Sequence, residues 1–110
     1  MKSCYFDAKT RSIADVCEYD GEYGVIGKRK SYLITRISVL PKSRRQGIGQ
    51  RLLSEIIADA DKDGVVLYLE IVPGDEDTKY EQLHMWYKNN GFKDCGIAIM
   101  KRKPVSTTVA

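Results

Sequence analysis

The sequence lacks the long apolar runs and the strong charge that mark several large classes of protein. No stretch of its 110 residues approaches the apolar length of a membrane span, and no apolar segment with cleavage-site residues opens the chain. The formal net charge of +3 is too small to indicate nucleic acid as the partner. We therefore expect a cytoplasmic protein that binds neither nucleic acid nor membrane directly.

Cysteine and histidine are also scarce. Cys4, Cys17 and Cys95 are an odd number and lack the paired spacing of metal ligands, so we expect no metal site. Reduced thiols in a cytosolic protein are the interpretation we favour. A catalytic cysteine is the weaker alternative, because the only histidine, His84, is not near any of the three in sequence.

The length and composition are those of one globular domain. Hydrophobic residues make up 43% of the chain and charged residues 30%. We place a single domain at residues 1–103 and expect residues 104–110 to be a flexible tail. Cations gather at residues 28–30, 42–45 and 101–103, which indicates local sites rather than a uniformly basic face.

Alternating and helical patterns predict a mixed fold. Strands are expected over Ser3–Asp7, Ile13–Asp20, Tyr32–Leu40 and Val65–Val72, and a strand or hairpin over Phe92–Lys101. Between the third and fourth strands, a helix runs from Gly47 and ends at a left-handed Gly64, with an apolar stripe along one face. Strand, helix and strand in that order predict a parallel, right-handed βαβ unit. A second helix is expected to end near Asn89, with Met85 and Trp86 packed against the sheet.

The stretch Ile37–Leu53 has the parts of an anion-binding site. Pro41 ends the strand, a basic loop follows, and Gly47 and Gly49 precede the helix, whose first N–H groups have no intrahelical partner. A P-loop lysine is absent, and Leu52 stands where a Rossmann fingerprint needs its third glycine. We predict a ligand that carries phosphate. The alternative is that the glycines serve only a turn and close packing.

Two motifs in this order resemble the GCN5-related N-acetyltransferases, or GNATs. Their Arg/Gln-x-x-Gly-x-Gly/Ala motif is matched by Arg44–Gly49, and their tyrosine, three residues and Gly-Phe by Tyr87–Phe92. The resemblance implies an α/β (α+β) fold: a mixed, mostly antiparallel sheet with a central parallel βαβ unit and two main helices. The chain is similar to short, phage-type members of the family, including an anti-CRISPR acetyltransferase. Typical members have two more helices ahead of the motif strand.

The resemblance also implies a co-substrate, acetyl-CoA, and residues that bind it. Backbone N–H groups at the helix start would surround the pyrophosphate, the arginine side chains would add charge, and the strand end would bond the pantetheine arm and acetyl group through its main chain. The Val39 amide is also the expected oxyanion donor. The implied cofactor-binding residues are Ile37, Ser38, Val39, Arg44, Arg45, Gln46, Gly47, Ile48 and Gly49.

Catalytic roles follow from the same resemblance. Tyr87 matches the tyrosine that protonates the departing CoA thiolate, and a core aromatic is the alternative interpretation. A protonated amine cannot attack, so a base is expected. Glu70 is our best candidate, with a solvent-facing strand residue as its alternative, and His84 and Asp77 follow.

The leading hypothesis is an acetyl-CoA-dependent enzyme that acetylates a primary amine, in particular a lysine of a protein. The reaction would proceed by direct attack in a ternary complex, without a metal. The rival hypothesis is a GNAT-like module that binds CoA, or nothing, and acts through protein contacts. A homodimer with a shared sheet edge or a swapped strand is compatible with so short a chain.

Overall fold

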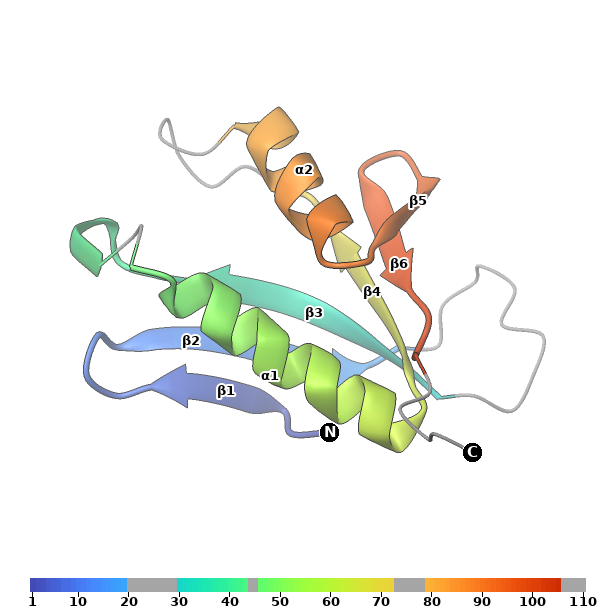
Figure 1. Ribbon diagram of the computed structural model, residues 1–110, viewed down its shortest axis with the longest axis horizontal. Coiled ribbons are helices and arrows are strands. Elements are labelled where there is room, and N and C mark those ends of the chain that lie inside the picture. The colour runs from blue at the N-terminus through green and yellow to red at the C-terminus, as the bar shows by residue number, and fades with distance from the viewer. Residues whose placement is uncertain (20–29, 44–45, 73–78, 106–110) are drawn as a thin grey trace.

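The computed structural model describes residues 1–19, 30–43, 46–72 and 79–105 of the chain (Figure 1). In chain order the elements are β1 (Cys4–Asp7), β2 (Ser12–Glu18), β3 (Ser31–Ser38), the 3-10 turn η1 (Pro41–Ser43), α1 (Ile48–Asp63), β4 (Val66–Glu70), α2 (Tyr80–Asn89), β5 (Lys93–Gly96) and β6 (Ile99–Arg102). Every predicted strand is present, with small shifts at its ends. The segment predicted as a strand or hairpin is the β5–β6 hairpin.

The strands form one sheet in the order β1-β2-β3-β4-β6-β5. Its neighbours are antiparallel except β3 and β4, which are parallel and are joined through α1. The predicted fold class, a mostly antiparallel mixed sheet around a parallel βαβ unit, is therefore confirmed. The parallel pair lies in the middle of the sheet, and α1, which joins its two strands, packs over β1, β2 and β3.

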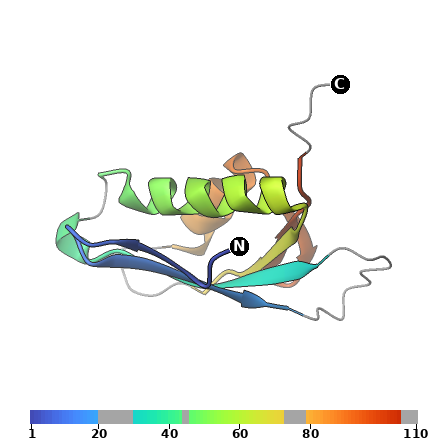
Figure 2. The ribbon, with the colours of Figure 1, turned by 90° about the horizontal axis from the view of Figure 1, so that it is seen from below.

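Helix α1 lies along one face of the sheet (Figure 2). Its apolar stripe is buried as predicted: Leu52, Leu53, Ile56 and Ala60 are fully inaccessible to solvent. Beneath it, alternate residues of β2 are also buried, as one face of a strand requires. The core between helix and sheet fixes where the start of α1 lies relative to β3.

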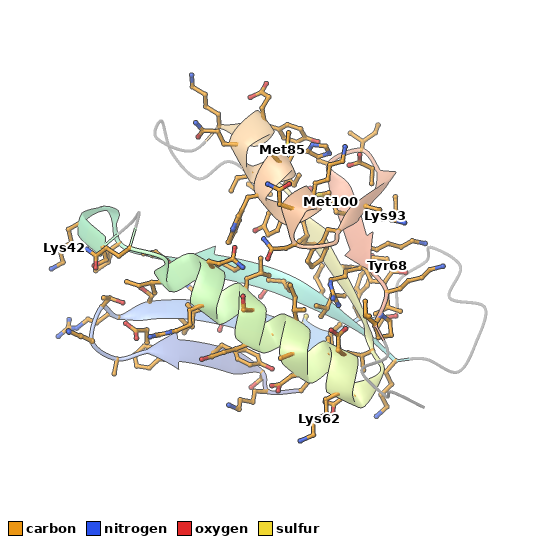
Figure 3. All side chains as sticks on the ribbon, viewed as in Figure 1. Lys42, Lys62, Tyr68, Met85, Lys93 and Met100 are labelled. Atoms are coloured by element: carbon orange, nitrogen blue, oxygen red, sulfur yellow. The ribbon has the colours of Figure 1, made fainter. Side chains whose placement is uncertain are left out.

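Helix α2 differs from the prediction in one respect. Met85, labelled in Figure 3, is 55% exposed, so the prediction that it packs against the sheet is wrong. Trp86, one residue on, is half-buried and packs against the core. A helix turns 100° per residue, so neighbouring apolar residues need not share a face, and here the sheet takes only the second.

Three further features bear on function. The three cysteines are free. No helix in the described ranges is long and apolar enough to cross a membrane, and no cluster of three or more acidic, histidine or cysteine side chains in them would hold a metal ion.

Candidate functional site

The parallel strands β3 and β4 separate at their carboxyl ends. Their pairing runs from Ser31 opposite Val66 to Ile34 opposite Leu69 and stops there, although β3 continues to Ser38. Figure 1 shows the two strands starting side by side and then diverging. The last three residues of β3, Arg36–Ser38, therefore pair with β2 on one side and leave the β4 side open.

A β-bulge marks the point of separation. Asp15 of β2 pairs with Arg36 while Val16 pairs with Ile34, so Thr35 is the extra residue on β3. The Thr35 hydroxyl donates to the Asp15 carbonyl oxygen at 3.1 Å. Bulges bend a strand and increase its local twist. This bulge accounts for β3 turning away from β4 one residue after their pairing ends.

The separation opens a cleft of about 450 Å³. Its walls come from four elements that are distant in sequence, and its lining residues are Ile34–Val39, Gly49, Leu69–Val72, Leu83, Trp86 and Tyr87. Six of the sequence-predicted site residues are among them: Ile37, Ser38, Val39, Gly49, Glu70 and Tyr87. The fold thus brings the end of the motif strand, the start of the motif helix and the predicted tyrosine to one cavity.

The start of α1 reaches this cleft through Gly49. Gly47, the N-cap residue, has a left-handed φ of 76°, and within the described ranges no side chain caps the helix. Gln46 and Gly47 are exposed, whereas the Ile48 side chain is buried in the core, so only the backbone of Ile48 is available to a ligand. Uncapped N–H groups and the positive end of the helix dipole make this end suited to an anion. The predicted arginines, Arg44 and Arg45, lie outside the described residues.

Tyr87 is buried in the wall of the cleft. Its ring lies 4.9 Å from that of Trp86 and 5.8 Å from that of Phe92, measured between centroids. Burial raises the pKa of the Tyr87 phenol to about 12. At neutral pH the phenol therefore keeps its proton, which makes it a possible proton donor inside the cleft.

The candidate bases are divided by the structure. Glu70, at the end of β4, is exposed and lines the cleft. His84 faces elsewhere: its Nε2 lies 2.8 Å from a carboxylate oxygen of Asp94, its ring stacks on Tyr80, and it is not among the residues that line the cleft. Asp77 lies outside the described residues. Glu70 is thus the only carboxylate among the lining residues that the structure describes.

A polar network between α1 and α2 was not predicted. The Trp86 indole Nε1–H donates to Gln50 Oε1 at 2.7 Å, and the Gln50 amide donates to Asn90 Oδ1 at 2.7 Å. The Asn90 amide donates in turn to Gln50 Oε1 and to the Trp86 carbonyl oxygen. The hydrogen-bonded residues lie about 40 positions apart, so no local sequence pattern predicts the network. The only signal in the sequence was that Gln50 directly follows the glycine motif.

Comparison with known proteins identifies the family. Residues 7–94 match the family model described as the acetyltransferase (GNAT) domain. The chain belongs to the GNAT family. That match spans the parallel βαβ unit, the cleft and all of α2. No curated protein matches the chain in sequence.

Solved GNAT-like structures share the fold. The anti-CRISPR protein AcrVA5 is 20% identical with a TM-score of 0.66, over 91% of this chain and 98% of that one. Naa50 of Arabidopsis thaliana, in complex with the bisubstrate analogue CoA-Ac-MVNAL, is 20% identical with a TM-score of 0.63, over 84% and 64% of the two chains. AtaTR bound with AcCoA is 18% identical with a TM-score of 0.61, over 84% and 57%. The last two are thus considerably longer than the segment they share with this GNAT chain.

Proposed function

We propose that this GNAT chain is an acetyl-CoA-dependent N-acetyltransferase that acetylates a primary amine, in particular a lysine of a protein. One observation carries the proposal: the cleft between β3 and β4 is bordered by the uncapped start of α1 and lined by the buried phenol of Tyr87. A CoA thioester needs an anion site for its pyrophosphate, a cleft for its acyl end and a proton donor for its departing thiolate. The bound ligands of Naa50 and AtaTR support the choice of co-substrate.

The cofactor would lie along the open edge of β3. Its pyrophosphate would accept hydrogen bonds from backbone N–H groups at Gln46–Gly49, with added charge from Arg44 and Arg45. The pantetheine arm contains two amides, and the main chain of Ile37–Val39, on the side that β4 leaves open, offers them strand-like partners. The thioester would then point into the cleft between the separated strands.

The chemistry is a direct transfer. The neutral amine attacks the thioester carbonyl carbon, a C–N bond forms and the C–S bond breaks, with the oxyanion stabilised by the Val39 amide. The CoA thiolate leaves with the proton of Tyr87, and the excess proton of the amine passes through water to Glu70. The raised pKa of Tyr87 keeps its phenol protonated before the reaction, as a donor requires.

The rival is a CoA-binding module with little or no activity. It is favoured by the exposure of Glu70, because a solvent-facing carboxylate at the end of a strand is ordinary surface and needs no catalytic role to explain it. In that case the cleft would serve to hold the cofactor, and the protein would act through its surface.

The experiment is acetylation of lysate proteins with acetyl-CoA, read by mass spectrometry, with CoA binding measured by calorimetry. We expect new acetyl-lysines with the native chain. Tyr87→Phe should lower turnover by about 100-fold and leave CoA affinity nearly unchanged. Glu70→Gln should slow turnover at neutral pH, and His84→Gln, outside the cleft, is the matched control.

The outcomes distinguish the acetyltransferase from the CoA-binding module. CoA binding without any new acetyl group would support the silent module. If the native chain neither binds CoA nor produces new acetyl groups, the enzyme is refuted and only a module that acts through protein contacts without CoA survives. Equal rates for Tyr87→Phe and the native chain would remove Tyr87 from the mechanism while leaving the enzyme in place.

A further inference from the structure

Trp86 occupies a particular position in the cleft wall. Its Cη2 and Cζ2 atoms lie 3.8 and 3.9 Å from where a Cβ atom on Gly49 would stand, and a methyl carbon of Val39 lies 3.8 Å from the same point. The indole therefore lies against the first turn of α1, at a point that the side chain at the end of the motif strand also approaches. It is half-buried and borders the cleft, so it is accessible to a ligand there.

The orientation of the indole is fixed by its neighbours. Its nitrogen-bearing edge faces α1, because Nε1–H donates to Gln50 and the adjacent ring carbons face Gly49. Asn90, one turn along α2, holds Gln50 from the other side. With its only hydrogen-bond donor engaged, the indole presents apolar carbon to the cleft.

Apolar aromatic surface at this point matches one part of coenzyme A. The nucleotide end is charged and polar, whereas the pantetheine arm carries a geminal dimethyl group and a thioethyl chain. A ligand whose pyrophosphate lies at Gly47–Gly49 and whose thioester lies between β3 and β4 must pass Val39 and Gly49, where Trp86 stands. Aromatic faces gain much of their binding energy from such apolar contact.

We infer that Trp86 is a binding residue for the pantetheine arm of CoA, and that Gln50 and Asn90 are positioning residues that hold its indole against α1. This inference rests on the proposed function, since it needs CoA in the cleft. It assigns to the chain a cofactor contact on α2 that is distinct from the backbone contacts of the glycine motif.

The chain itself supplies the first test, because Trp86 is its only tryptophan. We expect the indole emission to change saturably as CoA is added, with the same dissociation constant as calorimetry gives. The fragment of CoA without the pantetheine arm, 3′-phosphoadenosine 5′-diphosphate, should bind with a much smaller change in emission. If calorimetry detects CoA binding while the emission stays constant, the inference is wrong and the proposed function survives. If calorimetry detects no CoA binding, the proposed function itself fails.

Variants give the second test. Trp86→Ala should weaken CoA binding about tenfold and Gln50→Leu about threefold, from lost apolar contact and a lost hydrogen bond respectively. Neither should change the affinity for the fragment, which lacks the arm. Gln82→Leu, an exposed glutamine of α2 outside the cleft lining, is the control for Gln50.

A purely structural role predicts a different result. If Trp86→Ala and Gln50→Leu weaken CoA and the fragment equally, the two residues only stabilise the fold and the inference is overturned. Should Trp86→Ala fail to fold, Trp86→Phe and Gln50→Leu decide the matter, because both keep the apolar volume of the site.

Discussion

The two ends of α1 share a left-handed glycine but differ in how their terminal backbone groups are bonded. Gly47 and Gly64 flank the helix, with left-handed φ values of 76° and 68°, and a Cβ atom on either would meet nothing within 4 Å. At the C-terminal end the Gly64 N–H donates to the Ala60 carbonyl oxygen and closes the helix. At the N-terminal end the N-cap residue is Gly47, and no side-chain cap is found among the residues that the structure describes. The end that the protein leaves incomplete is the end that borders the cleft.

The C-terminal end carries three acids where the helix dipole disfavours negative charge. Each of them has a partner: Tyr5 donates to Asp59, Arg102 to Asp61, and the amino group of Met1 to Asp63. These contacts attach β1 and β6 to the helix. The difference between the ends teaches that the contacts at the C-terminal end of α1 build the fold, while in the proposed function the N-terminal end would bind the cofactor.

The largest expected effect separates the two glycines. Gly47→Glu should lower CoA affinity by more than about 100-fold, because it places bulk and negative charge where the pyrophosphate would bind. Gly64→Glu is the matched control, since it imposes the same φ strain at the other end of the same helix, and its CoA affinity should equal that of the native chain. Calorimetry with both variants decides the matter. Equal losses in the two would mean that strain, not the anion site, explains the effect.

The next largest effect concerns the C-terminal end of α1, where a substitution should lower stability and leave CoA affinity unchanged. Arg102 and Asp61 are 11% and 13% exposed and form two hydrogen bonds, at 2.6 and 3.2 Å. Arg102→Ala should lower the free energy of unfolding by about 3 kcal/mol, because it removes the counter-ion of a mostly buried carboxylate and leaves it only the Val105 N–H. CoA affinity of the folded fraction should not change. Urea denaturation measures the loss, and the double change Asp61→Leu with Arg102→Met should recover most of it.

An unaltered stability in Arg102→Ala would show that the pair contributes nothing to this end of the helix. The Arg102–Asp61 pair could not be predicted from the sequence alone. The acids at residues 59–63 conflict with the helix dipole, but nothing near them in the sequence points to a residue some 40 positions away in β6.

The same contrast divides what could be predicted from sequence. The βαβ unit, both flanking glycines, Tyr87 on a helix and the final hairpin follow from periodicity and turn chemistry, which act over a few residues. The bulge at Thr35 and the Gln50–Trp86–Asn90 network depend on partners distant in sequence. Met85 was misplaced because two adjacent apolar residues on a helix look alike until the sheet selects one of them.

Acid should affect the C-terminal end through Asp61. Burial opposes ionisation of this carboxyl, but hydrogen bonds from Arg102 and the Val105 N–H outweigh it and lower its pKa. A folded pKa below the unfolded one means that the stabilisation is present above the unfolded pKa and is lost as pH falls through the folded pKa. The free energy of unfolding should therefore decline below about pH 5, and less steeply in Asp61→Asn. Glu81→Gln, an exposed carboxyl on α2, is the control. A native slope in Asp61→Asn would assign the decline to other acids.

The smallest effect concerns the second glycine of the motif. Gly49 has no positive φ, and a Cβ atom there would meet Trp86 and Val39 at ordinary contact distances of 3.8 Å. Gly49→Ala should therefore raise the free energy of unfolding by about 0.5 kcal/mol, since alanine is the better helix former, and should change CoA affinity little. Gly47→Ala should instead lower the free energy of unfolding by about 1 kcal/mol, because alanine is strained at a left-handed φ. Urea denaturation of both variants distinguishes them. If Gly49→Ala proves the more destabilising of the two, Trp86 and Val39 leave no room for a methyl group at Gly49, and the left-handed φ of Gly47 costs less than the packing around the second glycine.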